Sequence, residues 1–318
     1  MFQSIDEVMD RFRAGQYLCT RSVATVIFLA SKMRRPILVE GPAGVGKTDL
    51  GQVLARVLGV ELVRLQCYEG LDETKALYEW EYAKQLLYTQ ILKEKIGEVL
   101  SGARDLRESV ERLTSQEDVF FSERFLLSRP LLRVIRSESV SVLLIDEIDK
   151  ADPEFEAFLL EFLSDFQVSV PEIGTFKARE RPMVILTSNN TRELSDALKR
   201  RCLHLYLDFP DDAMETEIVR MKVPEAGPTL ARQVVRFVHG LRELDLKKAP
   251  SVSEALDWAR ALALLNVGSL DDSVVRETLG IVLKHEGDVK KARDQVTRLV
   301  SRLPSASDEP RAATSGRS

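Results

Sequence analysis

The sequence has little cysteine and no long apolar run. Its three cysteines, Cys19, Cys67 and Cys202, are far apart and include no CxxC pair. We therefore expect buried, reduced thiols rather than a disulfide framework or a zinc site. No apolar run approaches the roughly 20 residues that a membrane span requires. The N-terminal residues are acidic and amphipathic, unlike a secretory signal, so we expect a cytoplasmic protein.

An excess of positive charge is also missing. The 318 residues include 45 Lys and Arg against 50 Asp and Glu, which gives a net charge of -5. This balance gives no support to nonspecific nucleic-acid binding, which favours a basic surface. The hydrophobic content of 44% and the charged content of 30% are those of an ordinary globular protein. The three histidines are scattered along the chain and offer no metal site.

What the chain does contain is an alternation of strand and helix patterns. Short apolar runs predict buried strands at 36–40, 61–66, 139–146, 182–188 and 203–207. Helical spacing predicts helices at 4–33 with a break at Gly15, at 50–58 and at 73–113. This alternation predicts an α/β fold over residues 1–210, with a five-stranded parallel sheet between helices. Residues 211–303 are predicted to form a small all-helical domain, and the polar residues 304–318 a disordered tail.

A glycine-rich segment joins the first predicted strand to the next helix. It reads Gly41-Pro-Ala-Gly-Val-Gly-Lys47-Thr48 and fits G-x-x-x-x-G-K-[ST] at each fixed position. Glycines let successive backbone N–H groups converge on phosphate oxygens, and the helix N-terminus adds favourable partial charge. Lys47 would reach the β- and γ-phosphates of a nucleotide, and the Thr48 hydroxyl would bind Mg²⁺. A glycine-rich turn without a ligand is the alternative, and the strand and helix on either side count against it.

Two acidic residues end the third predicted strand, Val142-Leu-Leu-Ile-Asp146-Glu147. Open α/β sheets bind ligands at the carboxyl ends of their strands. Asp146 would hold Mg²⁺ through its water shell, and Glu147 would orient the attacking water as general base. The acids that follow, Asp149, Asp152, Glu154 and Glu156, are interpreted as one exposed helix face. The residues predicted to bind nucleotide are Gly41, Pro42, Ala43, Gly44, Val45, Gly46, Lys47, Thr48, Asp49 and Asp146, and those predicted to hold the metal are Thr48 and Asp146.

With these two motifs the sequence resembles the AAA+ ATPases, and more closely the MoxR family, over about residues 10–265. The fourth strand ends in Thr187-Ser-Asn-Asn190, where AAA+ proteins place the sensor-1 residue. The resemblance favours Asn189 for this role, with Asn190 as the rival. It also implies that an arginine of Ala197-Leu-Lys-Arg200-Arg201 reaches the nucleotide of a neighbouring subunit. Arg201 is favoured over Arg200, and the catalytic set is then Lys47, Glu147, Asn189 and Arg201.

Further segments resemble one branch of the MoxR family. Residues 67–87 resemble the start of an insertion, predicted to be helical over about 70–135, and residues 166–189 resemble a hairpin, at about 166–180, followed by the sensor-1 strand. Together with Phe125–Leu132 they resemble the branch that contains CoxD. That branch implies maturation of a molybdenum hydroxylase such as carbon monoxide dehydrogenase, often beside a von Willebrand A-domain partner. The chain departs from the family at the sensor-2 position, where Lys248-Ala-Pro-Ser-Val-Ser-Glu254 opens a helix without an arginine.

The expected activity is Mg²⁺-dependent ATP hydrolysis in a homo-oligomeric ring that remodels a client metalloenzyme, and the resemblance implies a hexamer. One alternative is a nucleic-acid-associated AAA+ motor or a McrB-like GTPase, which the acidic composition disfavours. The other is a nucleotide-gated scaffold with negligible turnover, and a P-loop kinase fits least. Tyr17 either packs on adenine or belongs to the core, and the sequence does not decide between the two.

Overall fold

The computed structural model of the chain describes residues 2–91, 125–170 and 173–304. Three expectations therefore fall partly outside the described residues. They are the end of the helical stretch at 73–113, the hairpin turn at Pro171-Glu172 and the tail predicted for 304–318.

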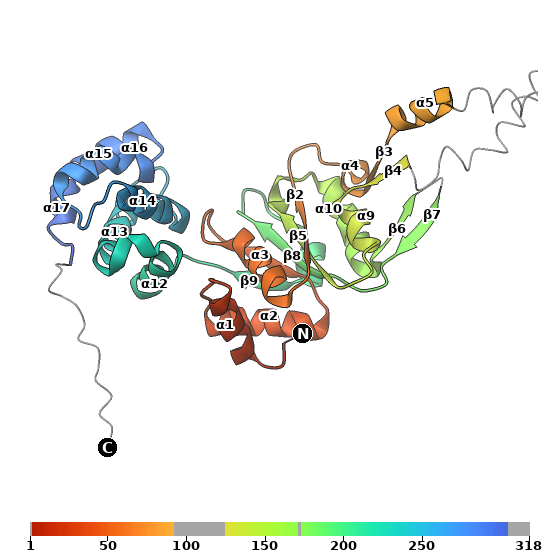
Figure 1. Cartoon of the computed structure of the whole chain (residues 1–318), viewed down its shortest axis with the longest axis horizontal. Coiled ribbons are helices and arrows are strands. Elements are labelled where there is room, and N and C mark those ends of the chain that lie inside the picture. Colours follow the sequence, from red (N-terminus) through yellow and green to blue (C-terminus); the bar gives the residue numbers. More distant parts are fainter. Residues whose placement is uncertain (1, 92–124, 171–172, 305–318) are drawn as a thin grey trace, which may run out of the picture. The chain divides into compact units, whose positions relative to one another are not determined.

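A five-stranded sheet forms the centre of the fold (Figure 1). Its strands lie in the order β2-β5-β8-β1-β9. They span Ile37–Glu40 (β1), Glu61–Gln66 (β2), Ser141–Asp146 (β5), Met183–Ser188 (β8) and Leu203–Tyr206 (β9). The α/β fold with a five-stranded parallel sheet is confirmed, and each strand lies within two residues of its predicted limits.

The inner strand β5, second in the sheet, explains where the acid pair begins. All six of its residues are buried, as expected for a parallel strand covered on both faces. Its register pairs Gln66 of β2 with Asp146, and Leu186 of β8 with Ile145. The end of β5 is thus flanked by the ends of two neighbouring strands, and polar side chains leaving those ends lie near one another.

The chain divides into two compact units, each described here by itself. The sheet unit comprises residues 1–2, 25–39 and 54–205. The glycine-loop unit comprises residues 3–24, 40–53 and 206–318. The glycine-rich loop thus groups with the N-terminal helix and the C-terminal helices, and the domain boundary expected near residue 210 stays a prediction.

The helices before β2 are α1 (Ile5–Ala14), α2 (Arg21–Met33) and α3 (Lys47–Leu58). As predicted, α1 ends before Gly15, and the chain then turns at Gln16 with φ 61°. Beyond the acid pair lie the 3₁₀ turn η2 (Ile148–Lys150) and the helices α10 (Pro153–Asp165) and α11 (Asp196–Arg201).

The insertion is not purely helical, which corrects the expectation for residues 73–113. Its described elements are α4 (Glu73–Leu77), β3 (Tyr78–Trp80), α5 (Tyr82–Ile91), β4 (Leu126–Ser128) and α9 (Pro130–Ile135). Strand β3 pairs with β4, a partner remote in sequence, and this pairing overrides the local helical spacing. A second antiparallel pair, β6 (Gln167–Val170) and β7 (Gly174–Lys177), packs against α9 (Figure 1).

The C-terminal residues are helical, as predicted. They form α12 (Asp212–Lys222), η3 (Pro224–Ala226), α13 (Gly227–Arg242), α14 (Val252–Leu264), α15 (Asp272–Val282), α16 (Glu286–Arg293) and α17 (Val296–Val300). Trp258 is fully buried at their centre and donates to Thr278 Oγ1 at 2.9 Å. None of the helices that the structure describes is both long and apolar enough to cross a membrane.

Candidate functional site

The glycine-rich loop lies between β1 and α3. Gly44 has φ 75° and Gly46 has φ 97°, a region that residues with a Cβ rarely adopt. An added Cβ at Gly44 would also overlap the Ser251 hydroxyl. The loop therefore requires glycine at these positions, and its geometry is that of a backbone cradle opening onto a helix N-terminus.

Lys47 is the first residue of α3, and its ammonium lies inside the curve of the loop. The side chain donates to the carbonyl oxygens of Gly41 and Pro42, both at 2.7 Å, and the residue is only 6% exposed. Thr48 follows in the first turn of α3 and is half-buried. Asp49 accepts from Lys222 of α12 at 2.9 Å. The predicted phosphate-binding residues thus form one continuous feature of the glycine-loop unit.

A cavity of about 350 Å³ lies against this loop within the same unit. Gly44, Val45 and Gly46 line one part of it, and the rest comes from residues 16–23, 206–222 and 252–256. Its wall is mainly apolar, with Val23, Met214, Ile218, Met221 and Leu256 among the lining residues. This size and composition suit a small organic ligand.

Tyr17 belongs to the core and also lines the cavity, and its packing on adenine stays a prediction. It is almost fully buried, stacks edge-to-face on Phe12 at 5.9 Å, and lines the cavity. Its hydroxyl donates to the Gly46 carbonyl at 3.5 Å, and burial raises the pKa of Tyr17. Cys19 also lines the cavity, as a free thiol with a pKa that burial raises to about 11. Cys67 and Cys202 are free and buried, as expected.

The start of α14, where the resemblance led us to look for an arginine, contacts the glycine loop. Ser253 donates to the Gly44 carbonyl from its backbone N–H and from its hydroxyl, both at 3.3 Å. Ser251 and Glu254 form a capping box that fixes this helix end. Burial raises the pKa of Glu254, but hydrogen bonds from Ser251 outweigh it, and the pKa is lowered overall. In this chain serines therefore occupy the contact with the loop.

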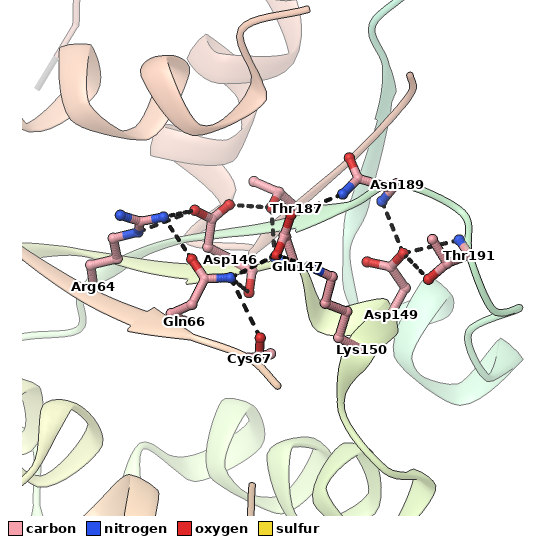
Figure 2. Close-up of polar contacts among 10 residues, drawn as sticks. All are labelled: Arg64, Gln66, Cys67, Asp146, Glu147, Asp149, Lys150, Thr187, Asn189 and Thr191. Atoms are coloured by element: carbon pink, nitrogen blue, oxygen red, sulfur yellow. Dashed lines mark hydrogen bonds and ion pairs between the residues drawn. The ribbon is translucent and has the colours of Figure 1, made fainter. Parts of the chain in front are cut away.

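The acid pair begins with Asp146 at the end of β5. This carboxylate is 1% exposed. Its Oδ1 accepts from Thr187 Oγ1 at 2.5 Å, and its Oδ2 accepts from Arg64 Nη2 at 2.5 Å and Nε at 3.1 Å (Figure 2). Thr187 in turn accepts from the backbone N–H of Glu147 at 2.9 Å. Side chains of β2 and β8 thus hold Asp146 from both sides.

Glu147 leaves the strand in a left-handed conformation with φ 57°. Its Oε2 accepts from Gln66 Nε2 at 2.9 Å and from Lys150 Nζ at 2.6 Å. Its Oε1 accepts from Asn189 Nδ2 at 3.1 Å (Figure 2). A positive φ in a glutamate is uncommon and marks a position whose backbone is constrained by its surroundings. Here the constraint aims the carboxylate at the end of β8.

The structure brings Asn189 to Glu147, and places Asn190 in the turn that follows. Asn190 has φ 57°, is exposed, and bonds with the Ser188 hydroxyl through its own N–H at 3.0 Å. This geometry supports the preference for Asn189 as the sensor-1 residue, a role that stays a prediction.

The interpretation of Asp149 and Glu156 as exposed is wrong. Asp149 is 3% exposed and accepts from the backbone N–H groups of Asn189 at 3.2 Å and Thr191 at 3.0 Å, and from the Thr191 hydroxyl at 2.6 Å. Burial raises its pKa, but these hydrogen bonds outweigh burial and the pKa is lowered overall. Glu156 is equally buried and accepts from the Ser195 N–H at 2.7 Å. Both carboxylates hold the loop that connects β8 to α11.

Arg200 and Arg201 end α11 and are both exposed. Arg201 Nε donates to Ser164 Oγ of α10 at 3.1 Å. Arg35 donates to the backbone carbonyls of Arg200, Arg201 and Cys202, which fixes the end of the helix. Neither arginine joins the contacts of the acid pair, in keeping with a role on a neighbouring subunit, which stays a prediction.

Sequence reasoning missed two side chains of β2. Arg64 and Gln66 are exposed residues that alternate with buried Val63 and Leu65, and both reach the acid pair. Two polar residues spaced i, i+2 at the carboxyl end of a strand were the available signal. It became informative only once β2 was known to lie beside β5.

Each unit, taken by itself, contains donor groups of a kind that a magnesium-bound nucleoside triphosphate uses. The glycine-loop unit offers backbone N–H groups, an ammonium and the Thr48 hydroxyl, and the sheet unit offers the buried Asp146 carboxylate. Hydroxyl and carboxylate oxygens are ligands that Mg²⁺ prefers, and N–H groups with an ammonium suit phosphate oxygens. The residues present are therefore those that such a ligand requires.

Comparison with known proteins agrees with this chemistry. The chain is 29% identical to the gas vesicle ATPase GvpN of Haloferax mediterranei over 279 residues, which cover 82% of this chain and 72% of that protein. It is 26% identical to the gas vesicle ATPase GvpN1 of Halobacterium salinarum over 276 residues, with the same shares of 82% and 72%.

Two solved structures are similar to the chain at lower identity. A mutant of Thermotoga maritima RuvB has a TM-score of 0.48 and 16% identity, covering 96% of this chain and 80% of its own. A putative ATPase from Cytophaga hutchinsonii has a TM-score of 0.45 and 14% identity, covering 94% of both chains. Residues 37–209 match the family described as "ATPase family associated with various cellular activities (AAA)". The chain belongs to this AAA family.

Proposed function

We propose that the chain hydrolyses ATP with Mg²⁺, using the glycine loop to bind the phosphates and Glu147 to activate water. The observation that carries the proposal is the placement of Glu147, which Asn189 and Gln66 hold at the end of β5 beside buried Asp146. Strands β1 and β5 belong to one parallel sheet with β8 between them, and sheets of this kind bind ligands at the carboxyl ends of their strands.

Each predicted residue has a distinct task in this reaction. The loop N–H groups and Lys47 bind phosphate oxygens, and Thr48 and Asp146 hold the metal, which neutralises charge on the phosphates. Glu147 accepts a proton from the attacking water, and Asn189 fixes the orientation of that carboxylate by donating to its Oε1. The Lys150 ammonium pairs with Oε2 of Glu147, so Oε1 is the oxygen on the Asn189 side.

The base of the nucleotide would occupy the cavity beside the loop. Its volume of about 350 Å³ and its apolar wall suit a purine ring, and Tyr17 supplies an aromatic surface. We propose ATP as the ligand. A panel of fluorescent ATP and GTP analogues, titrated with and without DNA, tests this assignment and the alternative of a GTP-dependent nucleic-acid motor.

The exposed arginine at the end of α11 supports the proposal of a ring of identical subunits. An exposed guanidinium that does not reach the acid pair of its own chain is available to a neighbour's nucleotide. We propose Arg201 for this role and a hexamer as the assembly. Phosphate release per subunit should then rise with protein concentration and be lost in Arg201→Ala, with Arg298→Ala, on α17, as the matched control.

For the client we propose a protein, and the segments near 67–87 and 166–189 favour a metalloenzyme with a von Willebrand A-domain partner. The curated relatives carry gas vesicle names, so a gas vesicle protein is the competing client. The proposal of a protein client rests on the acidic composition and on the resemblance of these segments.

The decisive experiment uses Glu147→Gln. This variant should retain ATP, lower phosphate release by about 10²- to 10⁴-fold, and trap the assembled ring with its client in a pull-down. Glu154→Gln, the same change at an exposed position of α10, should behave as wild type. Recovery of nucleic acid would favour a motor. Wild-type protein that binds ATP without turnover at any concentration would favour a scaffold and overturn the proposal.

A further inference from the structure

Arg64 is a charged residue on an edge strand, next to the most buried carboxylate of the sheet. Strand β2 lies at the edge of the sheet, and Arg64 lies two residues before its end. Residues 64 and 66 point to the same face because side chains alternate along a strand. The register places Gln66 beside Asp146, so both side chains can reach the acid pair from one direction.

The guanidinium engages a single oxygen of Asp146. Nη2 and Nε both donate to Oδ2, at 2.5 Å and 3.1 Å, while Oδ1 accepts from Thr187 (Figure 2). A carboxylate that is 1% exposed has little access to water, so its charge needs compensation from protein groups. Arg64 provides a full positive charge, and arginine does not lose its proton in proteins.

The same guanidinium is connected to Glu147 through Gln66. Arg64 Nη2 donates to Gln66 Oε1 at 2.6 Å, which orients the amide so that its NH₂ group faces Glu147. Gln66 Nε2 then donates to Glu147 Oε2 at 2.9 Å. One arginine therefore contacts the predicted metal carboxylate directly and the predicted general base through one amide (Figure 2).

Arg64 and a metal ion would compete for the carboxylate oxygens of Asp146. Mg²⁺ bound through Asp146 takes up the lone pairs of its oxygens, directly or through ordered water. Two cations that share one carboxylate oxygen also repel each other, and this repulsion is stronger near a buried group than in water. The Arg64 side chain is 46% exposed, so it can leave Asp146 without disturbing the core.

We propose that Arg64 is a positioning residue that occupies Asp146 until magnesium–nucleotide binds and is displaced by it. Arg64 then keeps the buried carboxylate compensated in the nucleotide-free protein and lowers its affinity for metal. Departure of the guanidinium also removes the donor that orients Gln66, which loosens the hold of Gln66 on Glu147. Metal binding and release of the general base are thereby coupled through one side chain. This inference rests on the proposed function.

The test is a Mg²⁺ titration of the binding of a fluorescent ATP analogue, followed by fluorescence anisotropy. Arg64→Gln should lower the half-saturating Mg²⁺ concentration by about 5- to 20-fold, the range typical of coupled binding events. Arg133→Gln is the matched control. Arg133 pairs with Glu61 at the other end of the same strand, so its loss should change the midpoint less than about twofold.

Measurement in EDTA separates competition from direct phosphate binding. Arg64→Gln should leave the metal-free affinity for the analogue within about threefold of wild type. A larger loss there would make Arg64 a phosphate ligand and overturn the inference, as would an unchanged or higher Mg²⁺ midpoint. Thermal melting checks folding, and Arg64→Met, which keeps the apolar stem, should give the same fall in midpoint. If neither variant folds, Arg64 is a structural residue and the inference is wrong.

Failure of the proposed function gives a different result. In that case wild-type protein binds no analogue at any Mg²⁺ concentration. If wild-type binding saturates with Mg²⁺ but the Mg²⁺ midpoint of Arg64→Gln is unshifted, the inference about Arg64 is wrong and the proposed function is unaffected.

Discussion

The glycine loop and the acid pair are built in opposite ways. The loop consists of contiguous residues whose backbone makes the binding surface, with Lys47 folded into it. The acid pair depends on side chains from three strands, because Arg64 and Gln66 of β2 and Thr187 of β8 hold Asp146 and Glu147 of β5. A backbone site is therefore encoded by local spacing, whereas a side-chain site is encoded by the order of strands in the sheet.

This difference predicts different sensitivities to mutation. The loop should be sensitive to changes at Lys47 and, less strongly, to an added Cβ at Gly44, and it should tolerate changes in its other side chains. The acid pair should respond to changes at residues that no local motif includes. The substitutions below test this contrast, beginning with the largest expected effect.

Removing the one side chain that the loop uses should affect ligand binding most. Lys47→Ala should weaken binding of magnesium–ATP by about 10- to 150-fold, which corresponds to one or two hydrogen bonds from a charged donor. Isothermal titration calorimetry measures the change. Lys290→Ala, on the exposed part of α16, is the control and should bind as wild type. Full affinity in Lys47→Ala would mean that the backbone alone binds the phosphates.

The second-largest effect is expected at Asp149, a buried acid that lies outside the two motifs. Asp149→Asn should lower the free energy of unfolding by about 1–3 kcal/mol, because the carboxylate accepts three hydrogen bonds from the loop at 189–191. Urea unfolding at pH 7 measures the loss. Asp165→Asn, at the exposed end of α10, is the matched control. Turnover should also fall in Asp149→Asn, because the backbone N–H of Asn189 loses the carboxylate that accepts its hydrogen bond.

The pKa of Asp149 also predicts how the stability of the folded protein changes with pH. The pKa of Asp149 is lowered in the folded protein, so folding favours its ionised form. The stabilisation is present above the unfolded pKa, about 3.9, and is lost as pH falls through the folded value. Wild type should therefore lose stability below about pH 4 more steeply than Asp149→Asn. Equal slopes for the two proteins would contradict a role for this carboxylate.

The smallest effect should come from the backbone of the loop. Gly44→Ala and Gly59→Ala place a Cβ at similar φ, 75° and 68°, but only Gly44 has neighbours there, the Ser251 and Ser253 side chains. Both variants should lose about 1 kcal/mol of stability from the strained φ. Gly44→Ala should lose about 1 kcal/mol more, and should also weaken nucleotide binding. Equal melting temperatures for the two variants would show that the contact with α14 contributes nothing.

The sequence was sufficient for the strands, the glycine loop and the position of the acid pair, because each is a local pattern. It was also sufficient to place Asn189 and Asn190 at the end of β8, and the resemblance favoured Asn189, but the sequence did not show the geometry that separates them. That geometry depends on the left-handed turns at Glu147 and Asn190, which direct one asparagine to the carboxylate and the other away.

The remaining features depend on neighbours remote in the chain. The sequence predicted that Asp149 and Glu156 are exposed, because acids at short spacing usually face water. In the structure both carboxylates accept hydrogen bonds from the loop at 189–195. Arg64 reaches Asp146 only because β2 lies beside β5, and chain order does not give that adjacency. The strand β3 within a helical pattern has the same cause, since its partner β4 lies some 45 residues away in the sequence.

The most direct test asks whether the loop and the acid pair serve one ligand. A double-mutant cycle with Lys47→Ala and Asp146→Asn, scored by ATP affinity with Mg²⁺ and again in EDTA, answers this. The account predicts a coupling energy of about 1 kcal/mol or more with Mg²⁺, and no effect of Asp146→Asn in EDTA. Additive losses within about 0.5 kcal/mol, or wild-type affinity that is the same with Mg²⁺ and with EDTA, would contradict it.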